Sequence, residues 1–273
     1  MSRIEEKHSF WWHLDILRTV LIRIIAVSVI CGIVAFLFKE EVFSFVLAPK
    51  SQNFVTYRFL DMLCDRFGLA PVGSFDVLLI NTGLAQQFII HMKTAFCVGV
   101  VCASPYILYQ LFAFIAPALY DNEKRNVVRI VFSGYLMFAL GLVFNYYVIF
   151  PLTFHFLGTY QVDVEVANMI SLDSYMSTLI VMSLCMGIVF EIPVLAWFFA
   201  KIGLLDATML KHYRRHAIVA ILIVAAVITP TSDVFTLLIV SFPMYILYEV
   251  SILLVRVTAT RKQYDTSVAT FPA

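Results

Sequence analysis

The sequence lacks the motifs on which most enzyme classes depend. It contains no Walker phosphate-binding loop, no HExxH, no GxSxG and no glycine-rich dinucleotide fingerprint. Nucleotide hydrolysis and proteolysis are therefore disfavoured, and we expect a protein that is not an enzyme and carries no cofactor. His212 and His216 lie four residues apart, but the neighbouring Lys211, Arg214 and Arg215 would repel a cation. No metal site is expected, because the pair has no nearby carboxylate or cysteine to complete it.

Charge and cysteine are also scarce. Only 14% of the residues are charged and the formal net charge is +1, which gives no reason to expect a nucleic-acid partner. The five cysteines form no CxxC motif and most of them lie within apolar runs, so we expect buried thiols and no disulfide framework. The N-terminal segment has no small-residue cleavage site before an apolar stretch, so it does not read as a signal peptide and is expected to remain on the mature protein.

Hydrophobic residues dominate what is present. They make up 62% of the chain, against about 45 to 50% in a soluble domain. Several runs are long enough to cross a hydrocarbon layer of about 30 Å, which takes about 20 residues. We predict an all-α polytopic membrane protein, a single transmembrane domain at 1–256 with six helices, the last two short. The predicted helices lie near residues 17–38, 88–117, 127–150, 175–200, 217–228 and 234–255.

The distribution of lysine and arginine predicts the orientation. Most of the basic residues fall on the side shared by the N-terminus, the short loops near 121–126 and 201–216, and the C-terminal tail at 257–273. By the positive-inside rule that side is cytoplasmic. The segment 39–87 is then a cap on the outer face. Since Pro105, Pro193 and Pro243 each interrupt an apolar run, we expect kinked helices in a concave arrangement.

Two acidic residues lie inside apolar runs. Glu191 stands in FEIP and Glu249 in LYEV, and a charge at mid-bilayer costs at least about 2.5 to 3.5 kcal/mol. Each is either a structural contact, protonated or bonded to a neighbouring helix, or a docking point for another membrane helix or a proton-coupled site. The last possibility gives an alternative function, a proton-coupled small-molecule transporter, which usually shows internal repeats that this sequence lacks.

Glu123 lies in a very short polar loop between two apolar runs, so it is expected at the membrane surface. It is either a first-turn acid favoured by the dipole of the following helix or a carboxylate that pairs with a partner's arginine through a two-point bond. The second geometry would select arginine over lysine.

Several segments together resemble the TatC family of twin-arginine protein translocases. The most characteristic is SPYILYQLFAFIAPALYDNEKR at 104–125. HLDILR at 13–18 and LAP at 47–49 are similar to the N-terminal and first-loop motifs, and FEIP at 190–193 to the fourth-helix motif. TPTSDVF at 229–235 and PMYILYE at 243–249 resemble the short final helices.

The resemblance implies a receptor that binds twin-arginine signal peptides and exports folded proteins with the proton-motive force. The implied partners are TatA and TatB-like single-helix membrane proteins, further copies of the chain and the lipid bilayer, in the bacterial plasma (inner) membrane. The implied residues are Glu123, Phe114, Arg18, Asp15 and Leu17 for the signal peptide, Pro49 for the outer cap, and Glu191, Asp233 and Glu249 for polar contacts and partner docking.

Two segments depart from the family pattern. The turn TPTSD at 229–233 is one residue longer than usual and is followed by Thr236 near a position where a glutamine is common, and the N-terminal motif differs at one residue. The family usually has an acid directly before LR, whereas this chain has Ile16 there and Asp15 one residue earlier. A shift of one residue turns a helical side chain by about 100°. We hypothesise that Asp15 or Glu6 supplies the second carboxylate of the arginine site.

Overall fold

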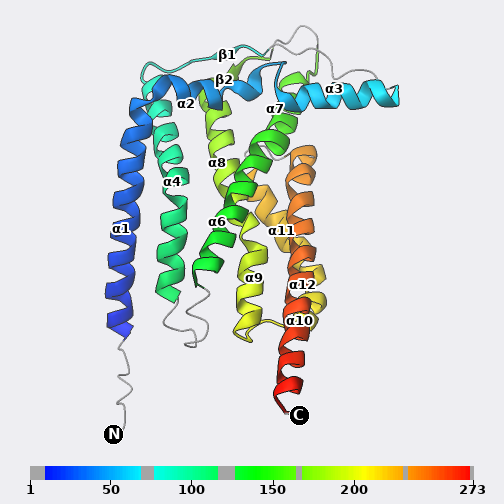
Figure 1. Cartoon of the computed structure of the whole chain (residues 1–273). Coiled ribbons are helices and arrows are strands. Elements are labelled where there is room, and N and C mark those ends of the chain that lie inside the picture. The colour runs from blue at the N-terminus through cyan, green and yellow to red at the C-terminus, as the bar shows by residue number, and fades with distance from the viewer. Residues whose placement is uncertain (1–9, 69–76, 116–126, 164–167, 230–232, 271–273) are drawn as a thin grey trace.

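The computed structural model describes residues 10–68, 77–115, 127–163, 168–229 and 233–270, and most of them are helical. Figure 1 shows a row of long helices that run roughly parallel, with shorter elements lying across one end. The long helix α1, Phe10–Leu37, begins at the opposite end and meets this layer at its last turn. The prediction of an all-α chain with several membrane-spanning helices is confirmed.

Five helical segments among the described residues are long and apolar enough to cross a membrane. They are Leu14–Leu37, Gln86–Phe114, Ile130–Thr159, Leu172–Lys201 and Val234–Thr258.

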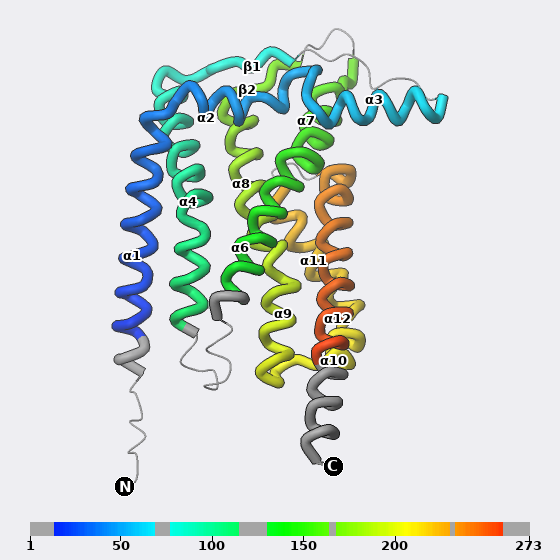
Figure 2. The backbone as a smooth tube through the Cα atoms, viewed as in Figure 1, coloured from blue at the N-terminus to red at the C-terminus, as the bar shows by residue number. Residues whose placement is uncertain are grey.

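These segments are built from eight helical elements. Beside α1 stand α4, Gln86–Ile115, and α6, Val127–Phe144, which continues through the π-helix η3, Asn145–Ile149, into α7, Phe150–Thr159. The next segment joins α8, Leu172–Phe190, to α9, Ile192–Lys201, and the last is α12, Val234–Thr270. Figure 2 shows that α6, η3 and α7 follow one continuous path, as do α8 and α9.

The two final helices differ from each other. A short helix α10, Ala207–His212, precedes α11, Arg214–Ile228, whose 15 residues extend only about 22 Å at 1.5 Å per residue. By contrast, α12 is one continuous helix of 37 residues. The prediction of a short last helix is therefore wrong, since α12 continues past Glu249, whose charge pairs with Arg214, and past the predicted end at residue 255. Six transmembrane helices stay a prediction.

The prolines act differently from one another. Glu191 separates α8 from α9, and Pro193 stands in the first turn of α9, where its missing N–H costs nothing. Pro105 and Pro243 instead lie inside α4 and α12, which remain continuous. Of the three expected interruptions, therefore, only the one at Pro193 coincides with a boundary between two helices.

The segment expected as a cap contains its own short elements. These are α2, Lys39–Val46, the 3-10 turn η1, Ala48–Lys50, and α3, Val55–Phe67. They lie across the end of the bundle away from the start of α1, and α3 extends sideways beyond it (Figure 1). The strand β1, Leu79–Ile80, pairs in parallel with β2, Ile170–Ser171.

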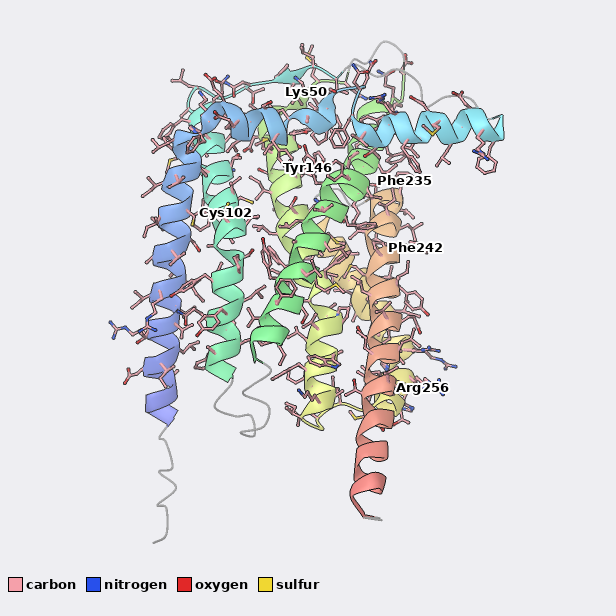
Figure 3. The ribbon with its side chains drawn as sticks, in the orientation of Figure 1. Lys50, Cys102, Tyr146, Phe235, Phe242 and Arg256 are labelled. Carbon is pink, nitrogen blue, oxygen red and sulfur yellow. The ribbon has the colours of Figure 1, made fainter. Side chains whose placement is uncertain are left out.

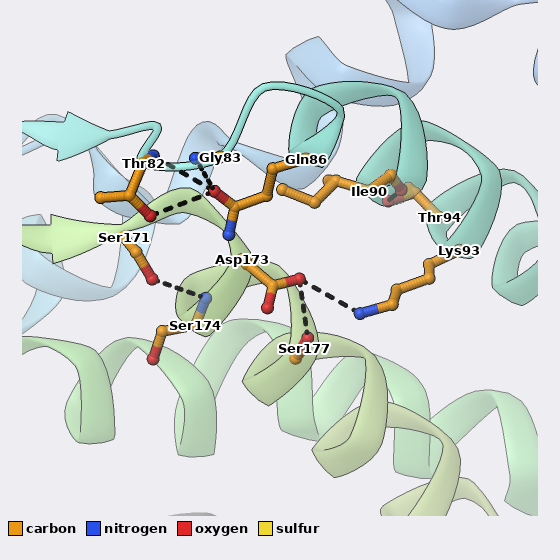
Figure 4. Close-up of polar contacts among 10 residues, drawn as sticks. All are labelled: Thr82, Gly83, Gln86, Ile90, Lys93, Thr94, Ser171, Asp173, Ser174 and Ser177. Atoms are coloured by element: carbon orange, nitrogen blue, oxygen red, sulfur yellow. Dashed lines mark hydrogen bonds and ion pairs between the residues drawn. The ribbon is translucent and has the colours of Figure 1, made fainter.

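The same end is joined by polar contacts between α4 and α8 (Figure 4). Lys93 Nζ lies 3.1 Å from Asp173 Oδ1. The Gln86 side chain accepts hydrogen bonds from the backbone N–H groups of Thr82 and Gly83 at 3.2 and 3.0 Å, which satisfies donors just before the first turn of α4.

The main core lies between α8 and the helices around it. Met176, Met182 and Met186 on α8 are almost fully buried, together with Phe150 of α7 and Val240 of α12. A smaller cluster holds α4, α6 and α9 together near the other end, where Phe112 and Phe198 pack edge to face with ring centroids 6.1 Å apart. This clustering fixes the relative positions of the helices that carry the candidate site.

Candidate functional site

The helices α1 and α4 cross at two glycines. A Cβ added at Gly99 would lie 2.5 Å from the backbone nitrogen of Gly32 and 2.7 Å from the carbonyl oxygen of Ser28. Small residues let membrane helices approach this closely. The crossing holds the two helices side by side in opposite directions, so the start of α1 and the end of α4 lie at the same end of the molecule (Figure 1).

Four of the predicted signal-peptide residues lie at that end. Asp15 and Arg18 are exposed on α1, Leu17 is partly buried there, and Phe114 is partly buried in the last turn of α4. Glu123, the fifth, lies outside the described residues. The structure therefore brings the start of α1 to the same end of the molecule as the end of α4, which leads into the segment 116–126.

Asp15 belongs to a shallow cavity of about 320 Å³ on α1. Its lining residues are Asp15, Ile16, Thr19, Val20 and Arg23. Asp15 and Arg23 are its charged lining residues, while Arg18 and Leu17 are not part of the lining. Asp15 and Ile16 thus share one recess although their side chains leave the helix in different directions.

Glu191 is the most buried of the predicted polar residues. Its side chain is 7% exposed, and neither carboxylate oxygen has a hydrogen-bond partner among the described residues. It faces α6, where a Cβ added at Gly134 would lie 3.2 Å from Oε2 and 3.5 Å from the ring of Phe112. Glycine at 134 therefore leaves the space into which this carboxyl group points.

Glu249 has partners within the chain. Arg214, the first residue of α11, places Nη2 at 2.6 Å from Glu249 Oε2, and the Tyr245 hydroxyl donates to Oε1 at 3.0 Å. The ion pair is partly exposed and links α11 to α12. Of the two interpretations left open, the structural contact is the one that these partners support.

Asp233 stands immediately before α12 and acts as its N-cap. Its carboxylate accepts a hydrogen bond from the backbone N–H of Thr236 at 2.7 Å and another from the Thr236 hydroxyl at 2.7 Å. Capping residues of this type satisfy backbone donors that have no partner inside the helix. Asp233 therefore helps to define where α12 begins.

An apolar groove opens between these helices and α6 to α7. Its volume is about 780 Å³, and its walls include Val148 and Leu152 on one side and Leu222, Phe235 and Phe242 on the other. Figure 3 labels Phe235 and Phe242 along α12. The groove gives this side of the bundle a concave apolar surface. A concave arrangement produced by kinks at the prolines stays a prediction.

Pro49 lies at the centre of the cap attachment. It is buried, and its carbonyl oxygen accepts a hydrogen bond from the Tyr57 hydroxyl at 3.1 Å, a group that also lies 3.1 Å from the carbonyl oxygen of Pro151. Burial raises the pKa of the Tyr57 hydroxyl well above its ordinary value, so the group remains a donor.

Two more tyrosines reach the same turn from below. The Tyr146 hydroxyl of η3 donates to the carbonyl oxygen of Phe45 at 2.6 Å, and the Tyr175 hydroxyl of α8 donates to that of Val46 at 3.1 Å. Figure 3 shows Tyr146 just beneath the cap. Together with Tyr57, these side chains fasten α2 and η1 to the bundle.

Sequence reasoning missed the partners of several predicted residues. Arg214 is 35 positions from Glu249, and Gly134 is 57 positions from Glu191, counted from the sequence numbers. No periodic signal joins residues so far apart. From the sequence there is only a weak indication that Tyr57, Tyr146 and Tyr175 hold the cap, because a tyrosine in an apolar segment combines a hydrophobic ring with a hydroxyl that needs a partner. No group of three or more potential metal ligands occurs among the described residues.

Comparison with known proteins assigns the family. The sequence model described as Sec-independent protein translocase protein (TatC) matches residues 12–243. The chain belongs to the TatC family. A TatC from Blattabacterium sp. subsp. Periplaneta americana is 33% identical over 257 residues, covering 92% of this chain and 96% of the relative. A TatC from Helicobacter pylori strain J99 is 42% identical over 183 residues, covering 67% of this chain and 73% of the relative.

The fold agrees with the family. A crystal structure described as the twin arginine translocase receptor TatC superposes with a TM-score of 0.73 at 31% identity, covering 90% of this chain and 99% of the other. A second TatC crystal structure, in the detergent DDM, gives a TM-score of 0.74. This chain is therefore a TatC subunit of the Sec-independent protein translocase, and the small-molecule transporter alternative has no support.

Proposed function

We propose that this chain is the twin-arginine signal-peptide receptor of its translocase and the core through which folded proteins are exported with the proton-motive force. The observation that carries the proposal is the match over nine-tenths of the chain to a solved TatC receptor. It is supported by the pairing of α1 with α4, which brings two predicted halves of the recognition surface to one end of the bundle.

The proposed recognition surface combines carboxylates with an apolar edge. Glu123 forms the two-point bond with a signal-peptide guanidinium, and Asp15 or Glu6 supplies the second carboxylate. Phe114 and Leu17 are half-buried at the same end, which suits them to contact the apolar part of a signal peptide. Arg18 is exposed on α1 and belongs to the same proposed surface.

The proposed membrane arrangement has six spans with both termini in the cytoplasm, in the bacterial inner membrane. The support is the bias of basic residues, since Arg18, Arg23, Lys201 and Arg256 all belong to segment ends on the N-terminal side. The span that completes the six is α11, the fifth in chain order. At about 22 Å it is shorter than the hydrocarbon layer, so the bilayer beside it is thinner than elsewhere.

Proposed partners are TatA and TatB-like single-helix proteins, a twin-arginine signal peptide and further copies of the chain. The apolar groove beside α12 and the carboxyl group of Glu191 are the features best suited to a membrane helix that carries a polar side chain. Asp233 and Glu249 shape that surface by fixing α11 and α12, and Pro49 shapes the outer cap.

Binding of a labelled twin-arginine peptide to the purified chain in detergent tests the receptor role. We expect a twin-lysine peptide and the Glu123→Ala variant each to lower the affinity by about tenfold or more, the value of losing one to two charge-assisted bonds. Asp121→Ala, in the same segment, is the matched control and should bind as the parent chain does. Equal binding of both peptides would refute the proposal.

The second carboxylate is tested separately. If Asp15 or Glu6 completes the site, the double variant Asp15→Asn with Glu6→Gln should lose affinity although Glu123 is intact. Unchanged affinity in that variant would remove both residues from the recognition surface.

A further inference from the structure

A second apolar cavity lies on the other side of α6 from the groove. Its volume is about 500 Å³, and it is bounded by α2 above and by α4, α6 and α8 around it. Representative lining residues, from one wall to the next, are Val42, Phe45, Cys97, Val98, Val143 and Leu179. None of the residues assigned to signal-peptide or partner binding lines this cavity.

The position of the cavity in the bilayer determines which molecules can enter it. The apolar span of α1 ends at Leu37, and α2 begins two residues later and lies across the ends of the long helices. The cavity therefore begins at the level of the headgroups and extends downward beside α4 and α6, within the hydrocarbon layer. A space of this kind open toward the membrane is filled by lipid, because an empty apolar cavity forfeits dispersion contacts and water gains few hydrogen bonds there.

One charged side chain lines the cavity. Glu41, in the first turn of α2, is exposed and makes no hydrogen bond or ion pair with another described residue. Its neighbours Lys39 and Glu40 are also exposed, but neither lines the cavity. A helix about 10 Å wide does not fit a space of this volume, whereas a single hydrocarbon chain does.

We propose that this cavity binds one acyl chain of a phospholipid from the leaflet on the α2 side, with Glu41 selecting a headgroup that carries an amine. The acyl chain lies between α4 and α6, beneath Phe45 of α2. The ammonium of an ethanolamine headgroup pairs with the Glu41 carboxylate. The headgroup of phosphatidylglycerol has the same phosphate but an uncharged glycerol, so it leaves Glu41 unpaired and has no positive charge to offset the repulsion between phosphate and carboxylate. The site is separate from the proposed peptide surface at the opposite end of the bundle.

Photo-crosslinking in nanodiscs tests the proposal. The full chain is reconstituted in equal amounts of phosphatidylethanolamine and phosphatidylglycerol, with a trace of either lipid carrying a diazirine in its acyl chain, and labelled peptides are identified by mass spectrometry. We expect the ethanolamine probe to label segments 94–101 and 142–147 preferentially. Even labelling of all lipid-facing segments would overturn the site.

Variants separate the chain-binding part from the headgroup part. Val98→Phe fills the cavity and should abolish labelling of segment 142–147, whereas Met92→Phe, at an exposed position of the same helix, should not. Val143→Phe, from the opposite wall, repeats the test if Val98→Phe does not elute as a single species in size-exclusion chromatography. Labelling that persists in both filled variants would overturn the proposal.

Headgroup choice is read from the ratio of the two probes. Glu41→Gln should lower the preference for the ethanolamine lipid by about 1.4- to 5-fold, the range for one exposed ion pair. Glu40→Gln removes the same charge from the same first turn of α2, but Glu40 does not line the cavity, so this variant should leave the ratio unchanged. An equal effect of the two variants, or an absence of any preference in the parent chain, would overturn the selection by Glu41.

Discussion

Gly99→Ala should separate α1 from α4 and weaken the whole candidate site. The new methyl carbon would lie 2.5 Å from the Gly32 nitrogen, 2.6 Å from its Cα and 2.7 Å from the Ser28 carbonyl oxygen. All three are backbone atoms, so no side chain can rotate away. Since non-bonded carbon contacts lie at about 3.5 to 4.0 Å, the helices must move apart by about 1 Å.

The cost of that displacement follows from overpacking. We expect a loss of about 1 to 3 kcal/mol, which corresponds to a decrease of about 2 to 12 °C in Tm at roughly 2 to 4 °C per kcal/mol for a chain of this size. This decrease in Tm is measured by thermal unfolding of the purified chain in detergent, with size-exclusion chromatography as the readout of folded protein. Binding of the twin-arginine peptide should fall in the same variant, because α1 carries Asp15 away from the end of α4.

Gly32→Ala is the matched control for this prediction. A Cβ at Gly32 would lie 3.5 Å from the Ala95 carbonyl oxygen and 3.7 Å from the Phe96 Cα, which are ordinary contacts. We expect little change in Tm, although the glycine lies at the same crossing. Equal Tm values for the two variants, or a larger loss in Gly32→Ala, would refute the packing argument.

Two further predictions concern the cap and the final hairpin. Tyr57→Phe removes the hydroxyl that contacts the carbonyl oxygens of Pro49 and Pro151, and should lower stability by about 1 to 3 kcal/mol because buried acceptors lose their donor, as measured by thermal unfolding. Arg214→Ala and Glu249→Gln should each have a small effect, with a coupling of about 0.2 to 1 kcal/mol in a double-mutant cycle of unfolding, because their ion pair is partly exposed.

Each of these has a control within the chain. Tyr160→Phe removes a hydroxyl from an exposed tyrosine, and a loss as large as that of Tyr57→Phe would contradict the role given to the buried contacts. For the hairpin, additive effects of Arg214→Ala and Glu249→Gln would show that the pair contributes nothing to the joining of α11 and α12.

Most of the fold could be predicted from the sequence because long apolar runs have few alternatives in a membrane. The runs at 17–38 and 88–117 overlap α1 and α4, although α1 begins earlier, at Phe10, in a more polar stretch. The helix α3 was not predicted as an element, since its apolar residues are interrupted by Arg58, Asp61 and Asp65. Its amphipathic pattern is that of a helix lying on a surface.

The candidate site could be predicted only in part. The residues of α1 and α4 could be placed at one end by counting spans, whereas the burial of Glu191 against Gly134 depends on the contact between two helices. In the same way, Glu249 shortened the uncharged apolar run from which a short last helix was predicted, and only the position of Arg214 shows which group pairs with its charge. Tertiary pairing of this kind leaves no trace in a local pattern.

The fastening of the cap has a consequence for sequence variation. The hydroxyl groups of Tyr57, Tyr146 and Tyr175 all end on carbonyl oxygens of the main chain, at Phe45, Val46, Pro49 and Pro151. Every amino acid offers the same carbonyl, so mutation of an acceptor position leaves the bond in place as long as the backbone keeps its course. The cap can therefore change much of its surface over evolutionary time and remain attached, while the three donors are the positions at which drift would detach it.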